Sequence, residues 1–408
     1  MGEVPSSRRR RYPILVYWFI RMPIHEFKIS RIGMRFFIGG IMGNIVYKIK
    51  DSVDLFLNDD DLLIAQFMNS RRRKMFKISD EIARLLEMID GEKNNEELFS
   101  GLQGLNVPKQ DIQLALEMLK QAGIIAQVSP EHVLSNAERE RYTRQLNYFG
   151  EFLDGELQAE IAQKKLQESK ILIFGIGSVG GDIALELARA GVEHYILFDY
   201  DVVEKSDVSR HMYYRIENVG QYKTEALAQE LKRINKNVVV NQVVEALNPT
   251  TDIEELIKNA DFIVNTADKP YIGYTSAKIS RLSVLNNKPH FIAGGFDAHL
   301  ASTGEIIIPY VTPCVECYTG YFKQKLANWK PKQHPVASRE KHIGGLAAMS
   351  LFSASYAACE IIKFITDIVD ENEEYKIRGE LLFNSLKLTH LDVKRNPDCI
   401  VCGGESHE

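Results

Sequence analysis

The stretch Lys170-Ile-Leu-Ile-Phe-Gly-Ile-Gly-Ser-Val-Gly-Gly181 decides the fold. It opens as an apolar run typical of a buried strand and continues into a Gly-x-Gly-x-x-Gly motif formed by Gly175, Gly177 and Gly180. Apolar residues then recur at helical spacing up to residue 188. Strand, glycine-rich turn and helix together predict a Rossmann-like nucleotide-binding domain, in which the glycines let the backbone approach phosphates.

A second predicted strand, at residues 194–198, ends at Asp199. This carboxylate lies about 20 residues beyond the glycines, where an acidic side chain accepts hydrogen bonds from ribose hydroxyls. An NAD-dependent dehydrogenase explains the pattern up to this point equally well. The glycines and Asp199 therefore predict a nucleotide and leave its identity open.

Charged residues farther along the chain favour ATP over NAD. Those that follow the second strand are Asp201, Asp207, Arg210 and Lys223. A third apolar strand, at residues 261–267, ends at Asp268. Cations neutralise the charge that develops on phosphates, and a carboxylate can hold Mg²⁺, whereas hydride transfer needs neither.

These motifs resemble those of the ThiF/MoeB and ubiquitin-activating-enzyme superfamily, over residues 137–408. The shared elements are Gly-x-Gly-x-x-Gly, Asp-x-Asp-x(5)-Asn-x-x-Arg-Gln, Gly-x-x-Lys and the strand-terminal Asp. The resemblance implies an adenylating enzyme that uses ATP and Mg²⁺. It implies that Asp199 binds ribose, that Arg210 and Lys223 bind phosphates, and that Asp268 binds Mg²⁺. Its implied nucleotide-binding set also includes Gly175, Gly177, Gly180, Asp201 and Asp207.

An arginine outside this domain core completes the expected catalytic set. The segment Arg141-Tyr-Thr-Arg-Gln145 resembles the Arg-Tyr-x-Arg-Gln segment of the superfamily. There the second arginine, here Arg144, reaches into the partner subunit's ATP site, which implies a homodimer.

Two positions depart from the superfamily pattern. Asp207 stands where Asn is usual, and His211 where Gln is usual. A further carboxylate beside phosphates is unfavourable unless Mg²⁺ or a lysine offsets it. Neutral drift and altered chemistry both remain open.

Four of the five cysteines form two Cys-x-x-Cys pairs, Cys314 with Cys317 and Cys399 with Cys402. Such pairs, in a chain without a secretion signal, predict a closed structural Zn²⁺ site of four thiolates. Cys359 remains, in an alanine-rich helical stretch where a buried, inert thiol is expected. The segment 321–345 holds no cysteine for a thioester, so activation without covalent relay is favoured. Its Lys323, His334, Arg339 and His342 are candidates for substrate contact only.

Residues 26–130 are predicted to form a small α+β module of winged-helix type, behind an extension at residues 1–25. The expected elements are a glycine-rich hairpin at 27–50, helices beginning at Ser79, Asn94 and Pro108, and a strand at 124–128. A winged helix can bind DNA, but the last helix has few cations. Capture of an extended peptide by strand addition is favoured, and a purely structural module is the alternative.

Composition restricts the partners. The 408 residues carry a net charge of −5, which argues against nucleic acid as the main partner. The apolar run at 12–20 contains Pro13, ends at Arg21 and lacks a cleavage site, so a signal peptide is disfavoured. No segment is expected to span a membrane. A cytoplasmic protein is predicted.

The fused module and the missing thioester cysteine resemble the peptide-modifying MccB and PaaA type, whose N-terminal clamp is PqqD-like. The resemblance implies ATP-dependent activation of a carboxylate on a ribosomally made precursor peptide. The product would be either nucleotidylated or dehydrated and cyclised. Two alternatives stay open: adenylation of a ubiquitin-like sulfur carrier's C-terminus, and a non-catalytic nucleotide-binding scaffold.

Overall fold

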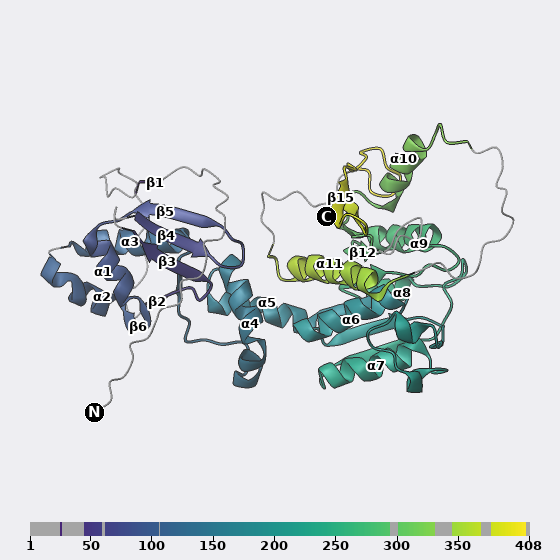
Figure 1. Ribbon diagram of the computed structural model, residues 1–408, viewed down its shortest axis with the longest axis horizontal. Helices are drawn as coiled ribbons and strands as arrows, with labels where there is room; N and C mark the ends of the chain where they lie inside the picture. The colour runs from purple at the N-terminus through teal and green to yellow at the C-terminus, as the bar shows by residue number, and fades with distance from the viewer. Residues whose placement is uncertain are drawn as a thin grey trace, which may run out of the picture. The chain divides into compact units, whose positions relative to one another are not determined.

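The structure is a computed structural model that describes residues 25–26, 45–58, 62–105, 107–293, 301–330, 345–368 and 377–404. Most of the hairpin expected at 27–50 and most of the extension at 1–25 lie outside these residues. The chain divides into two compact units, Met1–Val128 (unit 1) and Ser129–Glu408 (unit 2). Both units are drawn in Figure 1 and are considered separately.

Unit 2 is built on a six-stranded sheet. In chain order its strands are β8 (Lys170–Phe174), β9 (His194–Phe198), β10 (Val239–Val243), β11 (Phe262–Asn265), β12 (His290–Ile292) and β13 (Glu305–Ile307). In space the order is β10-β9-β8-β11-β12-β13, and every pairing is parallel except β12 with β13. The chain order reverses between β8 and β11. Ligands of such sheets bind at this switch point, outside the carboxyl ends of the strands.

Helices cover both faces of this sheet (Figure 1). The main ones are α6 (Ser178–Ala190), α7 (Lys223–Ile234), α8 (Glu254–Lys258), α9 (Ile272–Leu285) and α11 (Ala347–Ile365). Ile171 and Ile173 of β8 pack in one cluster with α6 and α11, and Leu172 of the same strand packs in another with α8 and α9. Burial on both faces explains why β8 is continuously apolar. The predicted Rossmann-like α/β class is confirmed.

Helix α11 is long and apolar enough to meet the length and composition of a membrane span, which the sequence analysis did not expect. Buried core helices of globular proteins meet the same measure. Here α11 packs along α6, and Ala354, Ala357 and Ile361 join the main core cluster. Its small residues let the two helices approach closely.

Unit 1 combines three helices with two small sheets. Its strands are β1 (His25–Glu26), β2 (Val46–Ile49), β3 (Val53–Leu57), β4 (Leu62–Phe67), β5 (Arg73–Lys77), β6 (Asp90–Asn94) and β7 (Ile125–Gln127). Its helices are α1 (Asp80–Met88), α2 (Asn95–Leu102) and α3 (Lys109–Gln121). One sheet has the order β1-β5-β4-β3 and the other β6-β2-β7. Both contribute side chains to one apolar cluster with the helices, which agrees with the predicted α+β class.

The helices of unit 1 begin where their capping residues predict. Ser79 is the N-cap of α1, and Asn94 forms a complete capping box with Glu97 at the start of α2. The strands β3 to β6 were not predicted. Gly91 lies within β6, whereas α1 already ends at Met88, so its expected role as the residue that ends α1 is wrong.

Candidate functional site

The glycine-rich turn leads from β8 into α6 and is shaped by close contact with the end of β11. Gly175 has a φ of +87°, and a Cβ there would lie within 2.8 Å of backbone atoms of Thr266 and Ala267. A Cβ on Gly180 would meet the carbonyl oxygen of Gly175 at 2.1 Å. These glycines are therefore required by the protein's own packing, before any ligand is considered.

Gly177 differs, because a Cβ there would meet nothing within 4 Å. It is the N-cap of α6, and no side chain caps this helix end. The first amides of a helix and its dipole favour an anion at such an end. The turn therefore fits a phosphate group, with Gly177 and the start of α6 as the residues that would hold it.

Two tyrosines hold the turn from behind. The Tyr213 hydroxyl donates to the carbonyl of Gly177 at 3.0 Å, and the Tyr214 hydroxyl donates to that of Ile176 at 3.2 Å. Burial raises the pKa of both tyrosines, so they are neutral donors at physiological pH. A Cβ on Gly181 would lie 1.7 Å from the Tyr213 hydroxyl oxygen. Sequence reasoning missed this pair, and only the aromatic doublet after His211 gave a signal for it.

Asp199 ends β9 beside the turn, as predicted. Its carboxylate accepts hydrogen bonds from the amides of Ile176 at 2.6 Å and Asp201 at 2.8 Å. Burial raises the pKa of this carboxyl group, while these amides act in the opposite direction. A carboxylate has about four acceptor positions, so two remain for ribose hydroxyls.

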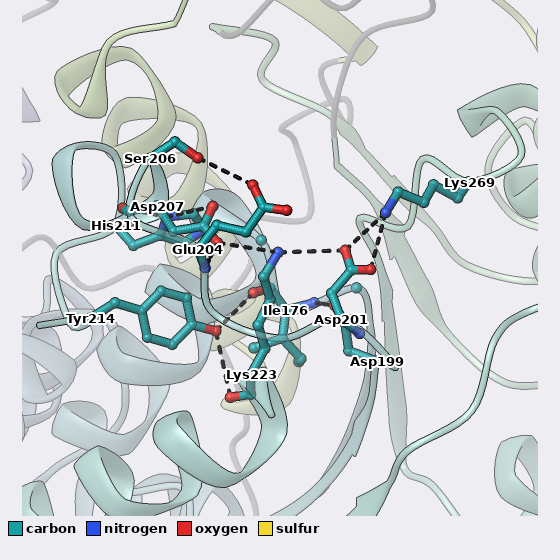
Figure 2. A network of polar contacts seen from close by, with 12 residues as sticks. Ile176, Asp199, Asp201, Glu204, Ser206, Asp207, His211, Tyr214, Lys223 and Lys269 are labelled. Atoms are coloured by element: carbon teal, nitrogen blue, oxygen red, sulfur yellow. Dashed lines mark hydrogen bonds and ion pairs between the residues drawn. The ribbon is translucent and has the colours of Figure 1, made fainter. Parts of the chain in front are cut away.

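Asp207 is a buried hub for the cations of the site (Figure 2). One oxygen accepts from Arg210 Nη2 at 2.7 Å, and the other accepts from the Glu204 amide at 3.0 Å and lies 3.7 Å from Lys223 Nζ. Burial would raise the pKa of Asp207, but the Glu204 amide and the cations together hold it below its ordinary value. The charge at the unusual Asp position is thus offset by a lysine and an arginine.

His211 is buried behind Asp207. Its Nδ1 lies 2.8 Å from the Asp207 carbonyl oxygen, and its ring packs against those of Tyr213 and Tyr214 at centroid distances of 5.7 and 4.8 Å. Burial lowers its pKa to about 4, so the ring is neutral at pH 7. With Nδ1–H donating to the carbonyl, Nε2 is a buried acceptor without a partner among the described residues.

Two lysines approach Asp201. Lys223 begins α7, its amide donates to the Asp201 carbonyl at 3.0 Å, and its Nζ lies 3.5 Å from the Asp201 carboxylate. Lys269 lies 3.0 Å from both carboxylate oxygens. The structure therefore adds a third cation, Lys269, that sequence reasoning did not select.

Two further predicted site residues are exposed. Asp268 follows β11 beside the glycine turn and forms no hydrogen bond or ion pair within the described ranges. Arg144 lies on α4 (Asn136–Phe152) and has none there either. Both side chains are available to a ligand or a partner. Their roles as Mg²⁺ ligand and trans-acting arginine remain predictions.

The four cysteines of the two Cys-x-x-Cys pairs come together. Their Sγ atoms all lie within 4.8 Å of one another, with Cys314 3.6 Å from Cys399 and Cys317 3.5 Å from Cys402. Tetrahedral Zn²⁺ with bonds of about 2.3 Å separates sulfur atoms by about 3.8 Å. The donor set and its spacing fit the predicted structural zinc, which would tie the start of α10 (Val315–Lys325) to the end of the chain.

Backbone contacts support this cluster. The amide of Asn396 points at Cys317 Sγ at 3.4 Å, and Arg395 donates to the Cys402 carbonyl at 2.6 Å. Amide-to-sulfur contacts of this kind orient metal-binding thiolates.

Two expectations about this part of the chain are wrong. Helix α10 continues to Lys325, so the segment expected as a loop from 321 begins as helix, because its amides continue the helical bonding started at Cys314. Cys359 is exposed, since it lies on a face of α11 that the described residues leave open. Of the four candidates in the segment, Lys323 lies on α10, and His334, Arg339 and His342 lie outside the described residues.

Comparisons with known proteins agree with this geometry. The model of the ThiF family matches residues 142–401. Protein HesA, vegetative, of Trichormus variabilis is 30% identical over 278 residues, which cover 67% of this chain and 92% of that protein. The adenylyltransferase and sulfurtransferase MOCS3 of Arabidopsis thaliana is 29% identical over 279 residues, or 68% of this chain. The match spans 54% of MOCS3, about half its length.

Solved structures resemble the chain over most of its length. The structure of E. coli MccB with AMPCPP and MccA has a TM-score of 0.64 at 21% identity, covering 88% of this chain and 99% of that one. PaaA has a TM-score of 0.63 at 22% identity, covering 85% of this chain and 100% of that one. At these identities the likeness describes the fold.

Proposed function

Because the chain belongs to the ThiF family, we propose that it uses ATP to activate a carboxylate on a ribosomally made precursor peptide. The observation that carries this proposal is the cluster of Arg210, Lys223 and Lys269 beside an uncapped helix start. Phosphates need such cations and amides, and a nicotinamide needs none of them. Reduced thiolates and ATP both belong to the cytoplasm, where we place the reaction.

The proposed step is adenylation. A carboxylate oxygen attacks the α-phosphorus, the bond from that phosphorus to the bridging oxygen breaks, and pyrophosphate leaves with the electron pair. Arg210 and Lys223 would offset the charge on the phosphates, and Arg144 of a partner subunit would add to them. Asp268 would hold Mg²⁺, which supplies further positive charge at the phosphates. The acyl-adenylate then leads to a nucleotidylated or to a dehydrated and cyclised product.

The peptide part of the proposal is supported by unit 1. Strand β3 ends its described four-stranded sheet, and Phe56 and Leu57 on this strand are 51% and 54% exposed. The opposite edge, β5, accepts the two-residue strand β1 in parallel pairing. Open strand edges with apolar side chains suit an extended peptide, which gains main-chain hydrogen bonds there. The structure of MccB with MccA, and the likeness to PaaA, add support.

The alternative is adenylation of a ubiquitin-like sulfur carrier. It is supported by the identity with MOCS3, an adenylyltransferase and sulfurtransferase, and with HesA. An acyl-adenylate on such a carrier would form by the same chemistry in unit 2. Unit 1 distinguishes the two functions, because only the peptide function requires it.

Substrate identity is tested by trapping. The variant Asp268→Asn, expected to bind ATP and substrate without turnover, is used to capture peptides from host lysate for mass spectrometry. Each captured peptide is then incubated with the wild-type protein, ATP and Mg²⁺. Added mass of a nucleotide or loss of one water supports the proposal. A captured protein ending in Gly-Gly that is adenylated instead would establish the alternative.

The role of unit 1 is tested with matched variants. Phe56→Asp places a charge on the exposed β3 edge, whereas Leu105→Asp places the same charge on another exposed apolar residue of unit 1, 47% exposed. We expect the first to weaken peptide binding about tenfold or more and the second to leave it within twofold, as single contacts of a few kcal/mol allow. Equal effects of the two variants would contradict capture at this edge.

A further inference from the structure

Lys269 crosses the mouth of the glycine turn. It follows β11, and its Nζ lies 3.0 Å from both carboxylate oxygens of Asp201, which follows β9. Strand β8 and its turn lie between β9 and β11 in the sheet. Figure 2 shows Lys269 reaching Asp201 from the far side. The side chain thus spans the place where the end of β8 would receive phosphates.

The surroundings of this ion pair make it exchangeable. The Lys269 side chain is 58% exposed and that of Asp201 28%. The ammonium also lies 5.2 Å from the centroid of the Tyr200 ring. A pair at this exposure contributes about 0.2–1 kcal/mol, so a ligand with more negative charge can displace the carboxylate. Asp201 does not become isolated, because Lys223 lies 3.5 Å away.

Charge balance shows why a third cation is needed. Around the turn, four carboxylates face only two cations if Lys269 is left aside. The carboxylates are those of Asp199, Asp201, Asp207 and Asp268, and the cations are Arg210 and Lys223. A triphosphate adds further negative charge, which Mg²⁺ offsets only in part. Lys269 is the nearest described cation that is not already committed to Asp207.

We propose that Lys269 is a phosphate-binding residue that Asp201 holds in position until a nucleotide arrives. On binding, the ammonium leaves Asp201 and contacts the triphosphate, while Asp201 stays paired with Lys223. Tyr200 guides the side chain by contact with the ammonium in both positions. This inference rests on the proposed function only in taking ATP as the nucleotide, and it is independent of the peptide.

The experiment measures binding of ATP and of adenosine by competition with a fluorescent ATP analogue. The variants are Lys269→Met, Lys269→Arg and, as control, Lys205→Met, which removes an exposed cation of the segment between β9 and α7. We expect Lys269→Met to weaken ATP about tenfold, as loss of one charged contact predicts, and to leave adenosine within twofold. Lys269→Arg should restore most of the ATP affinity, and Lys205→Met should match the wild type.

Each other outcome has a definite meaning. If Lys269→Met weakens ATP and adenosine equally, the lysine only supports the loop, and the inference is wrong. It is equally wrong if ATP binding does not change. A wild-type protein that binds neither ligand overturns the proposed function together with this inference. A wild-type protein that binds ATP while no peptide is modified overturns only the peptide part of the proposed function.

Discussion

Replacing Asp207 by asparagine should destabilise the protein and tighten its binding of ATP. The carboxylate of Asp207 is buried and contacts Arg210 at 2.7 Å and Lys223 at 3.7 Å. Asparagine keeps an oxygen that can accept from the Glu204 amide, now at 3.0 Å. The substitution therefore removes one negative charge with little change in shape. It also restores the residue that the superfamily pattern has at this position.

The magnitude follows from the exposure of the two cations. The Arg210 side chain is 44% exposed, so its contact contributes little to stability. Lys223 is only 11% exposed, but it keeps Asp201 at 3.5 Å. We therefore expect a loss of one charge-assisted contact, about 1.5–3 kcal/mol of unfolding free energy at pH 7. Since the pKa of Asp207 is held below its ordinary value, this contribution is present at neutral pH and disappears as the pH falls below about 4.

Binding of ATP changes in the opposite direction. Arg210 and Lys223 no longer have to leave a carboxylate, so we expect about tenfold tighter binding, or ~1.4 kcal/mol. Titration calorimetry with a non-hydrolysable ATP analogue and urea unfolding measure the two effects on the same protein. Glu204→Gln is the control, because it removes an exposed charge of the same segment that contacts no cation among the described residues. Weaker ATP binding with unchanged stability would refute the reasoning and place Asp207 in direct contact with the ligand.

Three further predictions concern zinc, the glycine turn and pH. The protein should contain one zinc per chain, and Cys317→Ser should abolish it and lower the unfolding free energy by several kcal/mol, whereas Cys359→Ser should leave the zinc content unchanged. Gly177→Ala should weaken ATP binding about tenfold or more at a stability cost below about 1 kcal/mol, because a methyl group there meets open space that the phosphate would use. By contrast, Gly181→Ala should cost about 1–3 kcal/mol of stability, because its methyl group meets Tyr213. The pKa of His211 is lowered to about 4, so the unfolded state takes up a proton that the folded state does not, and stability falls as the pH falls below about 6.5. Between pH 7.5 and 5.5 this histidine should account for about 1.3 kcal/mol, and urea titrations of His211→Gln should show a loss smaller by that amount, with His290 buried and neutral in both proteins.

Local signals predicted the parts of the chain that depend on local physics. Ser79 and Asn94 cap helices because their side chains or backbones suit a helix start, whatever the tertiary context. The apolar run at 170–174 became a central strand because only burial on both faces accommodates it. The two Cys-x-x-Cys pairs predicted their own meeting, because four thiolates share one chemical purpose.

What escaped prediction depends on partners far away in the chain. Lys269 is a single exposed lysine in the sequence, and only the order of β9, β8 and β11 brings it to Asp201. Tyr213 has meaning only once its hydroxyl is seen on the Gly177 carbonyl. Strands β3 to β5 carry several charged residues and exposed positions, so their alternation is weak, and pairing with one another defines them.

The pairing of cations with aspartates determines how this site should treat its ligand. Arg210 contacts Asp207, Lys223 lies between Asp207 and Asp201, and Lys269 contacts Asp201. A nucleotide must therefore compete with carboxylates that are already in place, and a free triphosphate brings more charge than the cations can balance. A bound Mg²⁺ would remove two of those negative charges and attract Asp268 as well. It follows that replacement of an Asn by Asp207 shifts the site towards the metal complex of the nucleotide. The affinity of this protein for ATP should then depend more steeply on Mg²⁺ concentration than that of the Asp207→Asn variant.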